Sequence, residues 1–281
     1  MAKKGPEYLS PSIYSRREPT EGNIERPAQK ACSELEKDAP FILTPHSLIG
    51  TAAVPTDFPF MAALGYSQNK SAPYDFRCGG TLIHDRFVLT AAHCLALRIP
   101  PSIVRLGMSD LDDPQEVRNR MDAIYIHPGF SLLDNINNIA LIELESPVSR
   151  SHYIKPTCLY TSADLTENTS VLAVGWGVID NTNEKKSNEQ VKNKMKILSN
   201  SKCRQEQLFE PSDMHLCASN NVHNLCMGGS GGPLIIVEDE SAKQYRQVGI
   251  ITFDFDCGSS TPDVFTQVSS YLDYIESIVW P

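Results

Sequence analysis

Short apolar runs separated by turn-forming residues fill the chain from residue 48 onward. Gly, Pro, Asn and Asp interrupt these runs, and all four residue types favour turns over strand interiors. Strands at such short spacing are typical of an all-β barrel or sandwich. The runs are FPFMAALGY, GGTLIHDRFVLTAAHC, SIVRLG, NNIALIEL, SVLAVGWG, PLIIVE, YRQVGIITF and DVFTQV.

Two further segments show a clear periodicity. In KMKILS, lysines alternate with Met195 and Ile197, which predicts a strand with one solvated face. The final segment, residues 269–280, predicts one amphipathic helix behind a serine cap. Its apolar residues at helical spacing are Leu272, Ile275, Ile278 and Val279.

Residues 1 to about 38 are different, because they are polar and contain prolines at positions 6, 11, 19 and 27. Such a segment has too few large apolar side chains to form a core of its own. We therefore expect an extended N-terminal tail, anchored only through Cys32.

Length and charge restrict the class of protein. The chain has 281 residues, enough for one domain of about 200 to 250 residues with an appendage. Its net charge of −9 argues against a nucleic-acid binder, whose domain should be basic. No segment approaches the roughly 18 apolar residues of a membrane span, and the start MAKKGPEYLS lacks the apolar run of a signal peptide. We expect a soluble, exported chain whose leader is missing from this sequence.

The eight cysteines fit that location. None forms the CxxC spacing of a structural zinc site, so four disulfides are the better interpretation. Two Asn-x-Ser/Thr sequences, at Asn69 and Asn168, are compatible with a secreted chain.

Three segments carry the candidate chemistry. TLIHDRFVLTAAHC delivers His93, NNIALIEL begins with a polar pair that includes Asn138, and NLCMGGSGGPL presents Ser230 among small residues. The order His, polar residue, Ser is the chain order of a serine protease triad. With CGGTLI, GWG and VSSYLDYI, these motifs make residues 47–281 resemble the trypsin/chymotrypsin family of serine peptidases, and in particular arthropod proteases with a disulfide-tethered N-terminal segment.

This resemblance implies a fold, a domain division and a disulfide set. The fold is a chymotrypsin-like double six-stranded β-barrel with a C-terminal helix, in which residues 47–281 form the protease domain and residues 1–46 a tethered tail. The pairs that the family implies are Cys78–Cys94, Cys203–Cys217, Cys226–Cys257 and Cys32–Cys158.

The residue that should be the triad acid is Asn138. In the family an aspartate at this position fixes the tautomer of the histidine and stabilises its protonated form. An amide can instead donate to the ring and fix the wrong tautomer, which costs about 10⁴ in kcat in a relative of this fold. Asp134 lies nearby in the sequence and is a second, weaker candidate for the acid.

The activation device is also changed. The family carries an aspartate directly before the serine, which pairs with the new amino terminus of the cleaved zymogen, but here that residue is Gly229. The cleavage site is replaced by His46 and Ser47, and no Lys or Arg occurs between Lys37 and Lys70. Both halves of the expected ion pair are therefore missing.

The substrate pocket departs from trypsin as well. Asn224 stands where trypsins carry the aspartate that binds Lys or Arg, and the strand that pairs with substrate is Thr252, Phe253 and Asp254. Asp254 and Asp263 replace glycines, and could select a basic side chain or, as we favour, fill the pocket. The N–H groups of Gly228 and Ser230 would form the oxyanion hole.

No metal or cofactor is expected. The acidic loop 108–116 has oxygen ligands of the kind calcium takes, but Met108 occupies the position of the first acidic ligand, so a solvated loop is favoured. The polar loop 180–192, with Lys185, Lys186 and Lys192, is a candidate binding surface.

These observations predict a secreted protease homologue with little or no peptidase activity, which acts by binding protein partners in a protease cascade of immunity or clotting. The alternative is an active serine endopeptidase that uses Ser230 and His93 on a polypeptide substrate.

Overall fold

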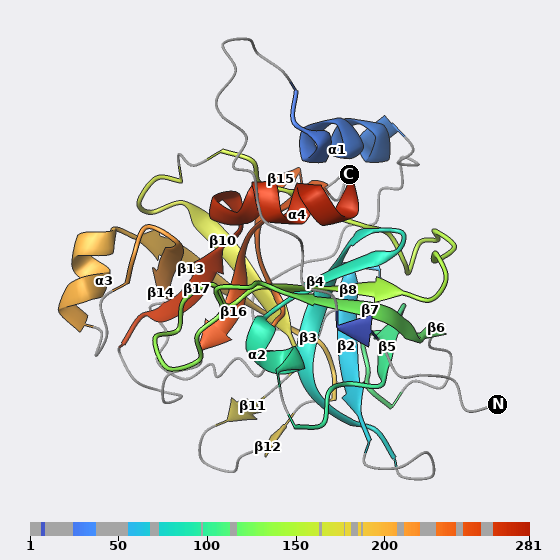
Figure 1. Cartoon of the computed structure of the whole chain (residues 1–281). Coiled ribbons are helices and arrows are strands. Elements are labelled where there is room, and N and C mark those ends of the chain that lie inside the picture. The colour runs from blue at the N-terminus through green and yellow to red at the C-terminus, as the bar shows by residue number, and fades with distance from the viewer. Residues whose placement is uncertain are drawn as a thin grey trace.

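Two β-barrel-like sheets, one of eight and one of seven strands in the described part of the chain, form the body of the molecule (Figure 1). The computed structural model describes residues 7–8, 25–37, 56–67, 73–96, 98–112, 117–162, 165–176, 178–180, 185–186, 188–206, 211–219, 229–239, 244–253 and 261–281. The predicted chymotrypsin-like double barrel is therefore confirmed.

The first sheet has the strand order β1-β7-β8-β4-β3-β2-β5-β6. All of its pairings are antiparallel except that of β1 with β7, which is parallel. Its strands are β1 (Glu7–Tyr8), β2 (Met61–Tyr66), β3 (Asp75–His84), β4 (Phe87–Thr90), β5 (Ile103–Leu106), β6 (Val117–Asn119), β7 (Met121–Ile126) and β8 (Ala140–Leu144).

The second sheet has the order β15-β10-β13-β14-β17-β16-β9, and an additional β15–β16 pairing closes the ring. Its strands are β9 (Cys158–Leu159), β10 (Ser170–Gly175), β13 (Val191–Leu198), β14 (His215–Ser219), β15 (Pro233–Asp239), β16 (Gln244–Phe253) and β17 (Asp263–Gln267). A separate hairpin pairs β11 (Val178–Asp180) with β12 (Lys185–Lys186).

The strand patterns follow the apolar runs of the sequence. In β13, Met195 and Ile197 are buried while the lysines between and beside them are exposed, as the alternation predicts. In β2 all residues are buried, because this strand lies in the wall of the packed barrel. The prediction missed β6, β7 and β14, whose sequences combine apolar with charged or histidine residues and give weaker periodicity. It also missed the two- and three-residue strands β1, β9, β11 and β12, which are too short to show a period.

The chain ends in the helix that the sequence predicts. A 3-10 turn, η1 (Val268–Tyr271), leads directly into α4 (Leu272–Val279). Leu272, Ile275 and Val279 pack into the larger core. Glu276 is also buried, although it is charged and only 2% exposed. The described part of the body also contains two short helices, α2 (Ala92–Leu95) and α3 (Asn200–Glu206).

Residues 27–37 differ from the expected extended tail, because they form a helix, α1 (Pro27–Lys37). Proline is favoured at the first helical position, since it has no N–H to leave unpaired there. Ala28, Cys32 and Leu35 then share one face and are buried. This apolar face is short, so it is hard to recognise within a polar, proline-rich segment.

The partners of α1 come from distant parts of the chain, and the helix lies beside α4 (Figure 1). Arg26 donates to Asp273 and, with both Nε and Nη2, to the carboxylate of Glu276. The same carboxylate accepts the N–H of Ala28, at 3.3 Å. Buried charges of this kind must be paired and hydrogen-bonded, and Arg26 and the Ala28 N–H, at the start of α1, are the partners of the Glu276 carboxylate.

No helix in the described part of the chain is long and apolar enough to span a membrane.

Candidate functional site

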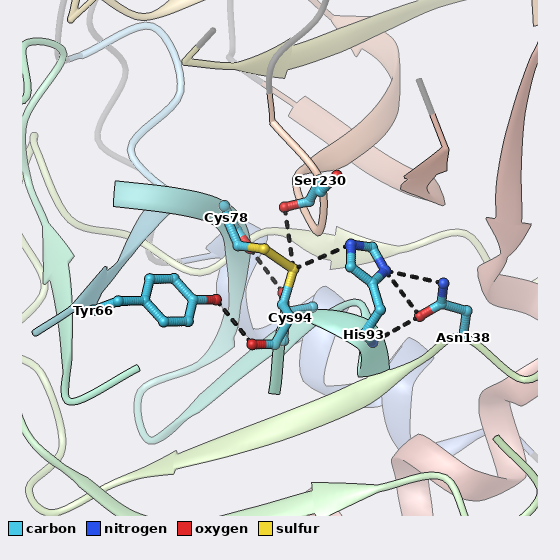
Figure 2. Close-up of a disulfide and its surroundings, with 8 residues drawn as sticks. Tyr66, Cys78, His93, Cys94, Asn138 and Ser230 are labelled. Carbon is cyan, nitrogen blue, oxygen red and sulfur yellow. Dashed lines mark hydrogen bonds between the residues drawn. A yellow bond between two sulfur atoms is a disulfide. The ribbon is translucent and has the colours of Figure 1, made fainter. Parts of the chain in front are cut away.

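His93, Asn138 and Ser230 lie together although they come from three separate segments (Figure 2). His93 belongs to α2, directly after β4, and Asn138 precedes β8 in the same sheet. Ser230 lies in the turn that leads into β15 of the second sheet. The Gly79 N–H donates to the carbonyl of Ser230 at 2.8 Å, so β3 of the first sheet holds the serine turn against it.

The turn at Ser230 requires glycine at the next position. Gly231 has a left-handed φ of 84°, and an added Cβ would lie 2.3 Å from Thr90 Oγ1 and 2.5 Å from Gly79 O. Any other residue would combine backbone strain with a collision against the wall of the first sheet. The GGSGG sequence is thus explained by close packing, and this turn presents a half-buried Ser230.

Asn138 is 1% exposed, and its side chain is hydrogen-bonded. Its Oδ1 accepts the backbone N–H of His93 at 3.0 Å. Nδ2 lies 3.0 Å and Oδ1 3.2 Å from His93 Nδ1, and Nδ2 also donates to Asn135 Oδ1 at 3.4 Å. Thr266 in β17 donates to the Asn138 carbonyl, so both sheets hold this residue. The amide therefore occupies the position of the predicted triad acid.

The other nitrogen of His93 does not engage the serine hydroxyl. His93 Nε2 lies 3.6 Å from Cys94 Sγ, and in the described part of the chain no hydrogen bond joins it to Ser230 Oγ (Figure 2). Sulfur in a disulfide carries no proton, so a hydrogen bond in this contact requires the proton to be on Nε2. Burial lowers the pKa of His93, and a hydrogen bond to Asn138 offsets part of that effect.

Asp134, the second candidate acid, is directed elsewhere. Its carboxylate accepts the hydroxyl of Ser131 at 2.7 Å within an exposed turn. The loop places Asn135 rather than Asp134 against the triad amide.

Comparison with known proteins agrees with this geometry. Residues 48–275 match the protein family described as Trypsin. The chain belongs to the trypsin family of serine proteases.

Its relatives include arthropod proteases. The chain is 37% identical to Serine protease Hayan of Drosophila melanogaster over 92% of its own length, but it spans only 42% of that protein. It is 30% identical to Phenoloxidase-activating enzyme 1 of Spodoptera litura, over 82% of this chain and 66% of the relative. It is 28% identical to the Clotting factor G beta subunit of Tachypleus tridentatus, over 82% and 79% of the two chains.

A solved structure with the same fold is that of neuropsin, a serine protease expressed in the limbic system of mouse brain. It superposes with a TM-score of 0.69 at 28% identity, over 80% of this chain and 96% of the neuropsin chain.

Gly229 is the residue that the sequence predicts in place of the activation aspartate. The residue is buried, and an added Cβ would lie 3.2 Å from Gly175 Cα, 3.8 Å from the nitrogen of Trp176 and 3.9 Å from Ile251 Cδ1. The β10 backbone therefore fills the space beside Gly229, and the chain has no carboxylate at this point. Residues 46 and 47, which are predicted to replace the cleavage site, lie outside the described residues.

The pocket residues are described in part. Thr252 is buried and donates to Val264 O at 3.0 Å, and Phe253 pairs with the same residue in β17. Asp263 begins β17 opposite Ala218, and burial raises its pKa to about 6. Three predicted residues lie outside the described residues: Asn224, Gly228 and Asp254.

Three disulfides are present in the described part of the chain. They pair Cys32 with Cys158, Cys78 with Cys94, and Cys203 with Cys217. The Cα atoms of the first pair are 5.1 Å apart, which joins α1 to β9 of the second sheet. Cys226 and Cys257 lie outside the described residues.

Metal ligands are poorly provided in the described part of the chain. The two clusters of ligand-type side chains each contain both sulfurs of a disulfide, which cannot bind a metal as thiolates. In the acidic loop, Met108 is buried, Asp110 accepts the N–H of Asp112, and Asp112 accepts from the amide of Asn188 at 2.8 Å. These contacts give the two carboxylates a structural role.

Sequence reasoning missed Asn135, the neighbour of the triad amide. It also placed Lys192 in a free polar loop, whereas Lys192 lies in β13, 3.9 Å from Asp57, with only 12% of its side chain exposed. Of the three lysines in the candidate binding loop, Lys192 is thus already paired.

Proposed function

We propose that this chain is a secreted trypsin-family homologue with little or no peptidase activity, which acts by binding proteins in a protease cascade. The observation that carries the proposal is the buried amide of Asn138, held against His93 Nδ1 where the chemistry needs a carboxylate. In this proposal residues 47–281 form the protease domain, and residues 1–46 form a segment tethered to it.

The chemical argument begins with the proton of the serine. A serine becomes a nucleophile when the histidine accepts its proton at Nε2, which requires the other proton to be on Nδ1. An aspartate favours that tautomer, and its charge stabilises the imidazolium that forms next. The neutral amide of Asn138 provides no such charge, and its Nδ2 lies 3.0 Å from Nδ1, where it can donate. A loss of about 10⁴ in kcat corresponds to roughly 5.5 kcal/mol of barrier.

Gly229 supports the same proposal independently. In the trypsin family, a buried ion pair between an aspartate and the new amino terminus orders the oxyanion hole and the pocket. Gly229 has no carboxylate, and the backbone of Gly175 lies close to where a side chain would begin. A new amino terminus made by cleavage before residue 47 would therefore find no carboxylate at position 229 to pair with.

A fluorophosphonate probe tests the proposal, because it reacts only with an activated serine beside an open oxyanion hole. We expect no labelling of the purified chain under conditions that fully label an active trypsin-family protease. Ser230→Ala is the matched control, since it removes the hydroxyl and leaves the turn intact. Labelling that reaches completion in the parent chain and disappears in Ser230→Ala would overturn the proposal.

That outcome would favour the second candidate function, a serine endopeptidase that uses Ser230 and His93. Its supporting observation is that both residues remain at the junction of the two sheets, as in an active site. Hydrolysis of a peptide by the purified chain, abolished by both Ser230→Ala and His93→Ala, would support it further.

The cascade role rests on the names of relatives, which include a phenoloxidase-activating enzyme and a clotting factor subunit. Proteases, zymogens or other polypeptides are the partners that such a role implies. Three disulfides in the described part of the chain favour an oxidising, extracellular location. If binding is the role, Ser230→Ala should retain full biological activity in a cascade reconstituted from haemolymph.

A further inference from the structure

Asn135 occupies a strained and enclosed position beside the triad amide. It is 6% exposed and has a left-handed φ of 52°, which asparagine adopts more readily than most residues. It lies in a tight turn, in which Ser131 and Ile136 exchange backbone hydrogen bonds. A strained backbone conformation at a buried residue persists only when the surrounding contacts stabilise it.

The backbone of Asn135 is anchored to the second sheet. Its carbonyl accepts from Nε2 of His215, in β14, at 2.9 Å. The proton must be on this nitrogen, because Nδ1 of His215 accepts the backbone N–H of Ser212 at 3.1 Å and lies 3.0 Å from its hydroxyl. Since His215 is only 4% exposed, this anchor is shielded from water and fixes where Asn135 stands.

The side chain of Asn135 then defines which way the Asn138 amide points. Asn138 Oδ1 must be the end that faces the His93 backbone, because that N–H can only donate. Its Nδ2 carries two protons, and two acceptors are within reach: Asn135 Oδ1 at 3.4 Å and His93 Nδ1 at 3.0 Å. A fully bonded amide therefore donates to both.

We propose that Asn135 is a positioning residue, which holds the Asn138 amide so that His93 keeps its proton on Nε2. The inference deepens the proposed inactive site, and it rests on that function only for its biological meaning. In this arrangement Nε2–H points to Cys94 Sγ, at 3.6 Å, and cannot accept the proton of Ser230. The opposite tautomer would bring the Nδ1 proton against the Nδ2 protons, at 3.0 Å, and its acceptor would be Asn138 Oδ1, at 3.2 Å, which already accepts the backbone N–H of His93.

Two substitutions at position 135 separate the acceptor from the backbone role. Asn135→Gly removes the acceptor and accepts the left-handed φ without strain. Asn135→Asp keeps an acceptor of the same shape, and it replaces Nδ2, which has no hydrogen-bond partner among the described residues, by a second oxygen that carries a negative charge when ionised. The acceptor for Asn138 Nδ2 is absent in the first variant and present in the second.

The readout is the tautomer of His93 in the full chain, measured by long-range ¹H–¹⁵N correlation NMR at about pH 8, where an imidazole is neutral. The parent chain and Asn135→Asp should show the Nε2–H form. Asn135→Gly should shift the population toward Nδ1–H by about fivefold, the value of one ordinary hydrogen bond. Urea unfolding of all three proteins confirms that the fold is retained.

Three results would overturn the inference: a parent chain already in the Nδ1–H form, an Asn135→Gly spectrum identical to the parent, or an Asn135→Asp spectrum shifted as far as that of Asn135→Gly. The parent spectrum decides even if a variant fails to fold. The measurement uses no substrate, so its failure is distinct from labelling of Ser230, which would overturn the proposed function while leaving the role of Asn135 intact.

Discussion

Restoring the missing activation acid, by Gly229→Asp, should destabilise the uncut protein. Gly229 is buried, and an added Cβ meets the β10 backbone at Gly175 Cα and the Ile251 side chain. The carboxylate would enter this space without the amino terminus that neutralises it in an activated protease. A buried charge that has lost its partner costs about 3–5 kcal/mol, a large part of the 5–15 kcal/mol that stabilises a typical domain.

The steric part of this cost can be measured separately with Gly229→Ala. Among the described glycines only Gly107 and Gly231 have a left-handed φ, so position 229 accepts a Cβ without backbone strain. The Cβ lies 3.2 Å from Gly175 Cα, so β10 must yield by a few tenths of an ångström, which places the alanine cost at the lower end of about 1–3 kcal/mol. The difference in the free energy of unfolding between the aspartate and alanine variants then gives the contribution of the carboxylate.

Urea unfolding as a function of pH is the assay. Burial raises the folded-state pKa of a carboxyl above its unfolded value, so the penalty is full above the folded pKa and disappears as the pH falls below the unfolded value near 4. The Asp variant should therefore approach the Ala variant in acid. Equal stability of the two variants at pH 8 would refute the reasoning. Adding an Arg-Ile-Val-Gly-Gly cleavage site at residues 46–50 and cutting it should restore stability to the Asp variant alone.

Three other outcomes follow from the site and its surroundings. Asn138→Asp should raise the pKa of His93, which burial now lowers, as measured by ¹H NMR titration. In peptide hydrolysis, Asn138→Asp alone should give far less activity than the same change combined with Gly229→Asp and the cleavage site. Because burial raises the folded-state pKa of Asp263 to about 6, the protein should lose stability as the pH rises from about 4 to 6. Asp263→Asn should remove this loss and raise the free energy of unfolding at pH 7 by about 1–3 kcal/mol; an unchanged urea midpoint at pH 7 would contradict this. Asn168, exposed in a turn with no side-chain partner among the described residues, should carry an N-linked glycan when the chain is secreted from insect cells, seen as a mass loss on enzymatic deglycosylation that Asn168→Gln abolishes.

The double barrel could be predicted because most of its longer strands have a local signal in the sequence. Alternation in β13 and the apolar runs around β4 and β8 report the burial of those same residues, and the turn residues report where strands end. His93 and Ser230 were also recognisable, since each lies in a short motif. Their proximity follows from the fold that those motifs imply.

The helix α1 and the role of Asn135 could not be predicted in the same way. The start of α1 is held by the carboxylate of Glu276, which accepts from Arg26, 250 positions away along the chain, and from the N–H of Ala28. Asn135 is one of several asparagines in a polar loop, and its φ and its contact with Asn138 exist only in the folded protein. Both features depend on pairs of residues that no local pattern connects.

The contact between Arg26 and Glu276 also constrains how the protein is made. A ribosome adds about 5–20 residues per second, so roughly 12–50 s separate the appearance of Arg26 from that of the carboxylate 250 positions later. Cys32 precedes its partner by 126 residues, whereas Cys78 and Cys94 are only 16 apart. During translation the Cys78–Cys94 bond can therefore form while Cys32 is still a free thiol, which can exchange with Cys78 or Cys94. Pulse-labelled chains trapped with an alkylating agent should contain the Cys78–Cys94 bond before the Cys32–Cys158 bond.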